Sequence, residues 1–165
     1  MAKPEDFMET VSILVDVQNI YYTTRHVFER HFDYNKFWAK VTQNRKVIQA
    51  SAYAIDRGDL KQKQFQNILR AIGFEVKLKP FIQRSDGTAK GDWDVGIALD
   101  AIEYAEQSDT VVLLSGDGDF DLLAQKIRTK YQSRVEVYGV QPLTAASLIK
   151  SASQFYPIES DLLLS

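Results

Sequence analysis

The 165-residue chain contains no cysteine, which excludes disulfide bonds, zinc sites built from thiolates, and cysteine nucleophiles. It contains only two histidines, His26 and His31, in one predicted helical region, so a zinc site built from imidazoles is disfavoured. No apolar run approaches the roughly 20 residues of a membrane span. The N-terminal segment MAKPEDFMET is acidic where a signal peptide is basic and then apolar. These absences and the length predict a cytoplasmic protein of a single domain, residues 1–165, with no membrane partner.

The overall charge also lacks a strong bias, because the net charge is −2 and the pI is near 5.7. That value is not typical of a nucleic-acid-binding protein. The charge is unevenly distributed, however. Residues 57–90 hold eight lysines and arginines against three aspartates and glutamates, and the remainder holds 12 against 19. An ordinary solvated surface is one interpretation of this basic segment, and it stays open at this point.

Hydrophobic periodicity predicts strands at residues 11–17, 46–55, 74–82, 110–115 and 134–140, with a sixth around 155–158. Helices are predicted between them, among them one over residues 92–107, and a polar loop over 84–90. Alternating strands and helices favour right-handed crossovers. We therefore expect an α/β, Rossmann-like three-layer fold. Its mostly parallel sheet would have five or six strands in the order 3-2-1-4-5, with helices on both faces.

In such open sheets, sites form at the carboxyl ends of the strands where the strand order reverses. The predicted first and fourth strands meet at this point, and they end in Asp16 and in Ser115-Gly-Asp117. Asp94 lies in the middle of the helix stripe that faces the core, whereas Asp92 faces solvent and Asp100 borders the stripe. A buried carboxylate needs a cation, hydrogen-bond donors or a proton. Asp94 could instead pair with Lys90 or accept backbone N–H groups.

The segment Asp117-Gly-Asp119 lies at a predicted turn from strand to helix. An acidic N-cap would explain Asp119 or Asp121, but it would not explain why Asp117 lies opposite Asp16. Converging carboxylates favour a hard cation, Mg²⁺ or Mn²⁺. The spacing of residues 116–128 does not fit a dinucleotide fingerprint or an EF-hand loop.

Three segments together resemble the NYN-domain group of PIN-like nucleases, in particular its LabA-like branch, over about residues 11–141. They are LVDVQNI at 14–20, KGDWDVGIALDA at 90–101 and LSGDGDF at 114–120. The resemblance implies that Asp16, Asp94 and Asp117 are metal ligands and catalytic residues, with Asp119 as a supporting acid that also belongs to the catalytic and metal-binding set. It also implies that Asn19 orients a ligand or the substrate phosphate. Gln18 departs from the family pattern, because many relatives have glycine there.

The resemblance implies a ribonuclease that uses Mg²⁺ or Mn²⁺ to hydrolyse phosphodiester bonds, with RNA, in particular single-stranded RNA, as its partner. Three further residues would contact the metal ligands, not the metal itself, and hold those ligands in position: Asp100, Lys90 and Ser115. Four basic residues would then follow the phosphate backbone: Lys61, Lys63, Lys79 and Lys90. Tyr21 and Tyr22 could stack on unpaired bases or serve only in packing. The alternative is a catalytically weak or inactive regulatory module that binds RNA or a partner protein, and a homodimer is also possible.

Overall fold

The structure, a computed structural model, describes residues 8–80, 82–83, 89–90 and 92–165, and for 82–83 and 89–90 it describes the backbone. The strands are β1 (Glu9–Asp16), β2 (Arg45–Asp56), β3 (Glu75–Pro80), β4 (Ile82–Gln83), β5 (Ala89–Lys90), β6 (Thr110–Leu114), β7 (Arg134–Gly139) and β8 (Gln154–Pro157). The α-helices are α1 (Val17–Phe28), α2 (Tyr34–Thr42), α3 (Leu60–Ile72), α4 (Asp94–Ala105), α5 (Asp121–Lys130) and α6 (Ala146–Ser151). Short 3₁₀ turns are η2 (Gly118–Phe120), η3 (Gln141–Leu143) and η4 (Ser160–Leu162).

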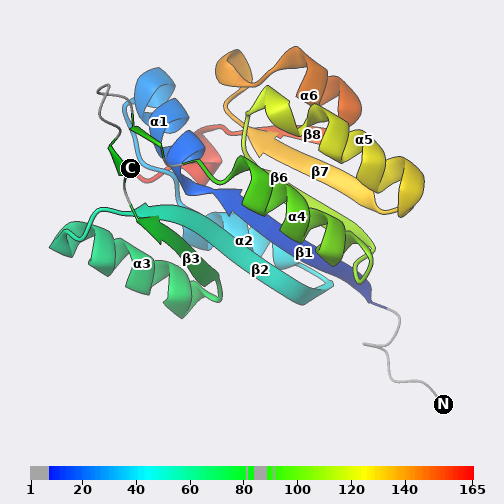
Figure 1. Ribbon diagram of the computed structural model, residues 1–165, viewed down its shortest axis with the longest axis horizontal. Coiled ribbons are helices and arrows are strands. Elements are labelled where there is room, and N and C mark those ends of the chain that lie inside the picture. The colour runs from blue at the N-terminus through cyan, green and yellow to red at the C-terminus, as the bar shows by residue number, and fades with distance from the viewer. Residues whose placement is uncertain (1–7, 81, 84–88, 91) are drawn as a thin grey trace.

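Six of the described strands form one parallel sheet in the order β3-β2-β1-β6-β7-β8 (Figure 1). This order confirms the predicted 3-2-1-4-5 arrangement, with β6 and β7 as the predicted fourth and fifth strands and β8 as the sixth. The order reverses between β1 and β6, which are neighbours although about 100 residues separate them in the chain. The carboxyl ends of β1 and β6 therefore lie side by side.

Helices cover both faces of the sheet, as the alternating pattern predicted. Helices α1, α2 and α3 share one core with alternate sheet residues such as Ile13 and Val112. Helices α4, α5 and α6 share the other core with the intervening residues, such as Leu14 and Val111. Figure 1 shows α4 and α5 lying across this second face. The continuous apolar runs of β1 and β6 follow from this burial on both sides.

Two predicted boundaries were wrong. The helix predicted from residue 92 begins at Asp94, with Trp93 at the N-cap position, and Asp92 lies before the helix with its Oδ1 accepting the N–H of Asp94 (3.2 Å). The segment predicted as a loop over residues 84–90 contains part of an antiparallel pair, since Ala89 pairs with Gln83 and Lys90 with Ile82. Residues 84–88 lie outside the described part of the chain.

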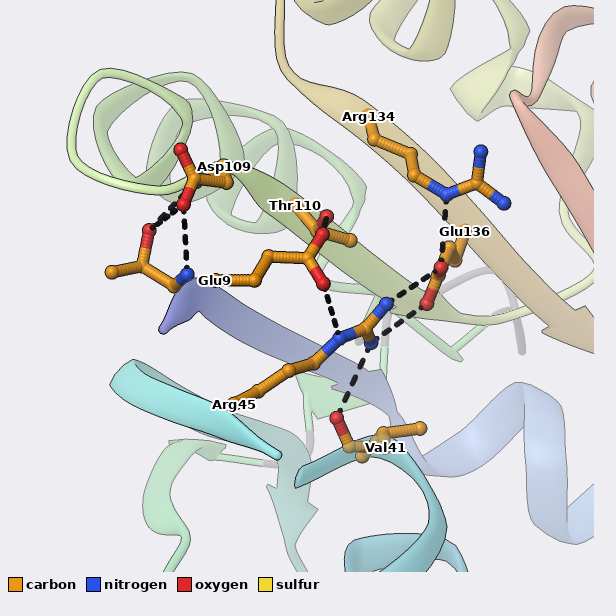
Figure 2. A network of polar contacts seen from close by, with 8 residues as sticks. Glu9, Val41, Arg45, Asp109, Thr110, Arg134 and Glu136 are labelled. Atoms are coloured by element: carbon orange, nitrogen blue, oxygen red, sulfur yellow. Dashed lines mark hydrogen bonds and ion pairs between the residues drawn. The ribbon is translucent and has the colours of Figure 1, made fainter. Parts of the chain in front are cut away.

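The amino end of the sheet is held by a network of charges around Arg45, the first residue of β2 (Figure 2). Its guanidinium donates two hydrogen bonds of 2.9 Å to Glu136 of β7, one of 2.9 Å to Glu9 of β1 and one of 3.3 Å to the Val41 carbonyl. Arg134 adds a hydrogen bond of 3.0 Å to Glu136. The Glu136 side chain is only 4% exposed, so this carboxylate depends on its partners to remain charged.

Candidate metal centre

Asp16 lies at the junction of β1 and α1, at the carboxyl edge of the sheet. Its Oδ1 accepts the N–H of Asn19 (3.4 Å), so Asp16 is also the N-cap of α1. Its Oδ2 accepts a hydrogen bond of 3.0 Å from Ser115 Oγ, and Ser115 directly follows β6. The Asp117 N–H in turn donates to Ser115 Oγ (3.2 Å). Ser115 thus connects two of the predicted ligands and holds them in a fixed relative position.

Asn19 ties the first turn of α1 to the turn that carries Asp117. Its Oδ1 accepts the N–H of Gly116 at 3.0 Å. This contact gives Asn19 a positioning role between the two segments. The role in orienting a ligand or phosphate, which the family resemblance implied, stays a prediction.

Two glycines flank Asp117 in the turn after β6, and both allow close packing. Gly116 and Gly118 do not have positive φ values, so neither needs glycine for a left-handed backbone. A Cβ at Gly116 would lie 2.8 Å from Thr144 Oγ1 and 3.0 Å from the Leu143 carbonyl oxygen. A Cβ at Gly118 would lie 2.8 Å from Ala145 Cβ. The two glycines therefore allow the segment before α6 to pack against the turn that presents Asp117.

Trp93 fixes the start of α4, and no pattern in the sequence pointed to it. Its Nε1 donates a hydrogen bond of 2.9 Å to the Ala54 carbonyl near the end of β2. Its ring packs edge-on against Tyr53 with centroids 5.3 Å apart, and a Cβ at Gly96 would lie 2.6 Å from it. Trp93 thus anchors the amino end of α4 to the sheet, and Asp94, the next residue, points from there into the site.

The result is a group of three half-buried carboxylates from Asp16, Asp94 and Asp117. One oxygen from each lies within 4.8 Å of the others. Burial is the largest effect on Asp94 and raises its pKa, and the charges of Asp117, Asp92 and Asp16 and a hydrogen bond with Asp117 raise it further, to about 7. Burial also raises the pKa of Asp16, although hydrogen bonds from Ser115 and Asn19 oppose this effect. The three groups therefore repel one another when all are ionised.

This donor set fits a small divalent cation. Two oxygens on opposite sides of one Mg²⁺ lie about 4.2 Å apart, so small side-chain rotations would bring all three groups to ligand distance. Carboxylate oxygens without nitrogen or sulfur partners suit Mg²⁺ or Mn²⁺ better than zinc. A bound cation would also remove the repulsion that raises the pKa of Asp94.

Three other predicted site residues, Asp119, Asp100 and Lys90, have different surroundings. Asp119 is exposed and outside the group of three, and its N–H donates to Asp117 Oδ1 at 2.9 Å. The Asp100 carboxylate accepts hydrogen bonds of 2.7 Å from both Tyr53 and Lys77. The supporting role predicted for Asp100 stays a prediction. The backbone of Lys90 lies in β5, and its side chain is outside the described part of the structure.

The predicted phosphate-binding lysines differ in their surroundings. Lys61 and Lys63 are exposed on α3. Lys79 is partly buried, with Nζ 3.3 Å from the Asp92 carbonyl oxygen and 4.4 Å from the centre of the Trp93 ring. Lys79 therefore lies beside the start of α4, whereas Lys61 and Lys63 lie in the first turn of α3.

The raised pKa values predict how the metal-free protein responds to pH. Because the folded pKa of Asp94, about 7, is above its ordinary value of 3.8, the unfolded chain ionises first and stability falls as pH rises through this range. At pH 8 in EDTA we expect Asp94→Asn to melt at the same or a higher temperature than the parent. Adding Mn²⁺ should raise the melting temperature of the parent only. Circular dichroism melts from pH 4 to 8 measure both, and a clearly lower melting temperature of the variant in EDTA would instead give Asp94 a structural role.

In the described part of the chain, no helix combines the length and the apolar character that crossing a membrane requires.

The NYN domain family model matches residues 10–159. The low amplitude and bright protein LabA of Synechococcus elongatus is 28% identical over 116 residues, which cover 67% of this chain. The match spans 62% of that relative, less than two thirds of its length. The crystal structure of a Vibrio parahaemolyticus protein of unknown function is 55% identical, with a TM-score of 0.92, and the match covers 99% of this chain and 100% of the other.

These matches confirm the resemblance drawn from the three acidic segments. The chain belongs to the NYN domain family, in the LabA-like branch of the PIN-like nuclease superfamily.

Proposed function

We propose that this protein is a ribonuclease that hydrolyses phosphodiester bonds of single-stranded RNA with the help of Mg²⁺ or Mn²⁺. The observation that carries the proposal is the convergence of Asp16, Asp94 and Asp117 at the carboxyl edge of the sheet. Their mutual repulsion favours a cation at this position, and the chain belongs to a nuclease-type family.

Each residue of the site has a task in this proposal. Asp16, Asp94 and Asp117 would hold the cation, and Ser115 and Asn19 keep two of these ligands in place through the hydrogen bonds described above. A bound divalent cation supplies charge stabilisation at the phosphoryl group and lowers the pKa of water. Asp119, exposed beside Asp117, is the carboxylate that we assign to accept the proton of the attacking water.

A nuclease assay tests the proposal directly. End-labelled single-stranded RNA should be cleaved in Mg²⁺ or Mn²⁺ and remain intact in EDTA. An Asp117→Asn preparation, purified in the same way, controls for contaminating nucleases, because it should be inactive. RNA that is bound but not cleaved under any of these conditions would instead support the regulatory module.

Neutralising the predicted phosphate-binding lysines should weaken RNA binding. Replacing Lys61, Lys63 and Lys79 with glutamine removes up to three phosphate contacts, each of which contributes roughly 0.7 to the slope of log affinity against log salt for a single strand. We expect the slope to decrease by as much as roughly two. Fluorescence anisotropy from 50 to 300 mM salt measures it.

A matched variant carries the same change of charge elsewhere, at Lys36, Lys46 and Lys126, which are all exposed. It should keep the slope of the parent. If both triple variants behave alike, residues 57–90 are an ordinary solvated surface and only the net charge matters.

A further inference from the structure

The outer face of α1 carries a row of exposed side chains that starts at the candidate metal centre. This face has five exposed residues, Gln18, Tyr21, Tyr22, Arg25 and His26. Those that are three or four positions apart in the sequence lie next to one another on the helix surface. Tyr21 is 48% and Tyr22 62% exposed. Two adjacent tyrosines this exposed contribute little to the core, so part of each ring is accessible to a ligand.

Both tyrosine rings are held by their neighbours. Tyr22 stacks on His26 with ring centroids 5.8 Å apart and an interplanar angle of 16°. Tyr21 stacks on His31 at 6.0 Å and 26°, and Arg25 Nη1 donates a hydrogen bond of 2.8 Å to its hydroxyl. Because these contacts restrict the rotamers before a ligand arrives, less side-chain entropy is lost on binding.

A hollow of about 490 Å³ lies next to the same rings, lined by Tyr21, Arg25, Glu29, Arg30 and His31. Arg30 is fixed in it, since its Nε donates to the Leu164 carbonyl at 2.8 Å. The volume is within the range of small-ligand sites. The lining includes two guanidinium groups, Arg25 and Arg30, and one carboxylate, Glu29. Aromatic faces beside guanidinium groups suit a base and its phosphate.

We propose that this face of α1, from Gln18 to Arg25 with the adjoining hollow, binds the unpaired bases and phosphates of the RNA strand and leads the strand to the carboxylates. This inference rests on the proposed function, because it identifies the path of that substrate. Asp16 caps α1, so the helix starts at the site itself. At a rise of 1.5 Å per residue, Tyr21 to Arg25 lie about 7–14 Å from Asp16 along the axis. That span corresponds to roughly two to four stacked nucleotides.

The α1 face and the lysines of α3 offer different chemistry to the same strand. Lys61 and Lys63 supply charge, whose contribution declines steeply with salt. The tyrosines supply stacking, which every base can use and which salt weakens little. The two surfaces therefore make separable contributions to affinity.

Binding of a fluorescein-labelled 12-nucleotide RNA, measured by anisotropy in EDTA so that no cleavage occurs, tests the inference. We expect the double variant Tyr21→Ala with Tyr22→Ala to bind at least about tenfold more weakly, since stacking on one ring contributes roughly 5- to 150-fold. Replacing both tyrosines with phenylalanine keeps the rings and should keep the affinity. Melting temperatures show whether the exposed substitutions leave the fold intact.

An abasic oligonucleotide of the same length separates base stacking from other effects. The parent should bind it much more weakly than the normal strand, whereas the double alanine variant should bind both alike. Equal affinity of the parent and the alanine variant for normal RNA would overturn the inference, as would equal weakening for both oligonucleotides.

If binding depends on the tyrosines but no metal supports cleavage, the proposed hydrolysis fails and the α1 path holds. If metal-dependent cleavage occurs but binding does not depend on the tyrosines, the hydrolysis holds and the α1 path fails.

Discussion

Asp94→Asn is expected to reduce RNA cleavage by at least about 100-fold, whereas Asp92→Asn should retain most of it. The two residues are close in sequence but differ in position. Asp94 belongs to the group of three carboxylates, whereas Asp92 is exposed and lies before the start of α4, where its Oδ1 accepts the Asp94 N–H. Loss of groups that only support a metal ligand typically costs 10- to 100-fold, so loss of a ligand itself should cost at least as much.

Initial cleavage rates and Mn²⁺ affinity from isothermal titration provide the measurement, with Asp92→Asn as the matched control. The control also carries its own expectation. Because the charge of Asp92 raises the pKa of Asp94, removing that charge should shift the pH profile of metal binding to lower pH. Equal and nearly complete losses in both variants would mean that Asp92 also contacts the cation, and the group of three would then be incomplete.

Arg45→Met is expected to destabilise the protein by about 3 kcal/mol, because it leaves the buried Glu136 carboxylate without its bidentate partner. For a chain of this length, that change lowers the melting temperature by roughly 6–12 °C. Arg134→Met removes the other arginine from the same carboxylate. Since the Arg134 side chain is 44% exposed, that control should cost less than about 1 kcal/mol. Thermal melts at neutral pH compare the two, and similar losses would show that Arg45 has no special place in the network.

The pH dependence of the same variants adds a second readout. Burial raises the pKa of Glu136, but hydrogen bonds from Arg45 and Arg134 outweigh it and lower the pKa below the ordinary 4.5. A lowered folded pKa stabilises the fold above pH 4.5, and this contribution is lost as pH falls through the folded value. The difference between the parent and Arg45→Met should therefore shrink below about pH 4.5. A difference that stays constant with pH would indicate lost packing of the arginine side chain instead.

The sequence predicted the three aspartates that meet, Asp16, Asp94 and Asp117, but it also predicted Asp119 in the metal site, and Asp119 lies outside the group. Asp16 and Asp117 follow continuous apolar strands, and the alternation of strands and helices made those two strands neighbours. Asp94 was predicted from its helical phase, which placed it on the stripe facing the core. The structure brings Asp94 to the site as the first residue of α4, whereas the prediction made it the third residue of a helix that began at residue 92.

The interactions that hold these residues could not be predicted in the same way. Trp93 reaches the Ala54 carbonyl, and Arg45 reaches Glu136, 91 residues away. Both contacts depend on strand register and on how a helix crosses the sheet. Neither property produces a periodic pattern in the sequence. The pair of β4 and β5 has two residues in each strand, too few for alternation to be recognised.

The repulsion among the three carboxylates also bears on how this protein could change over evolutionary time. A single aspartate-to-asparagine substitution needs one nucleotide change, relieves that repulsion and leaves the Arg45 network at the far end of the sheet untouched. Because active sites often sacrifice stability for function, this substitution is expected to make the metal-free chain at least as stable as the parent. The descendant would keep its exposed tyrosines and lysines, so under the proposed function it would bind an RNA strand without cleaving it and protect the strand from the parent protein.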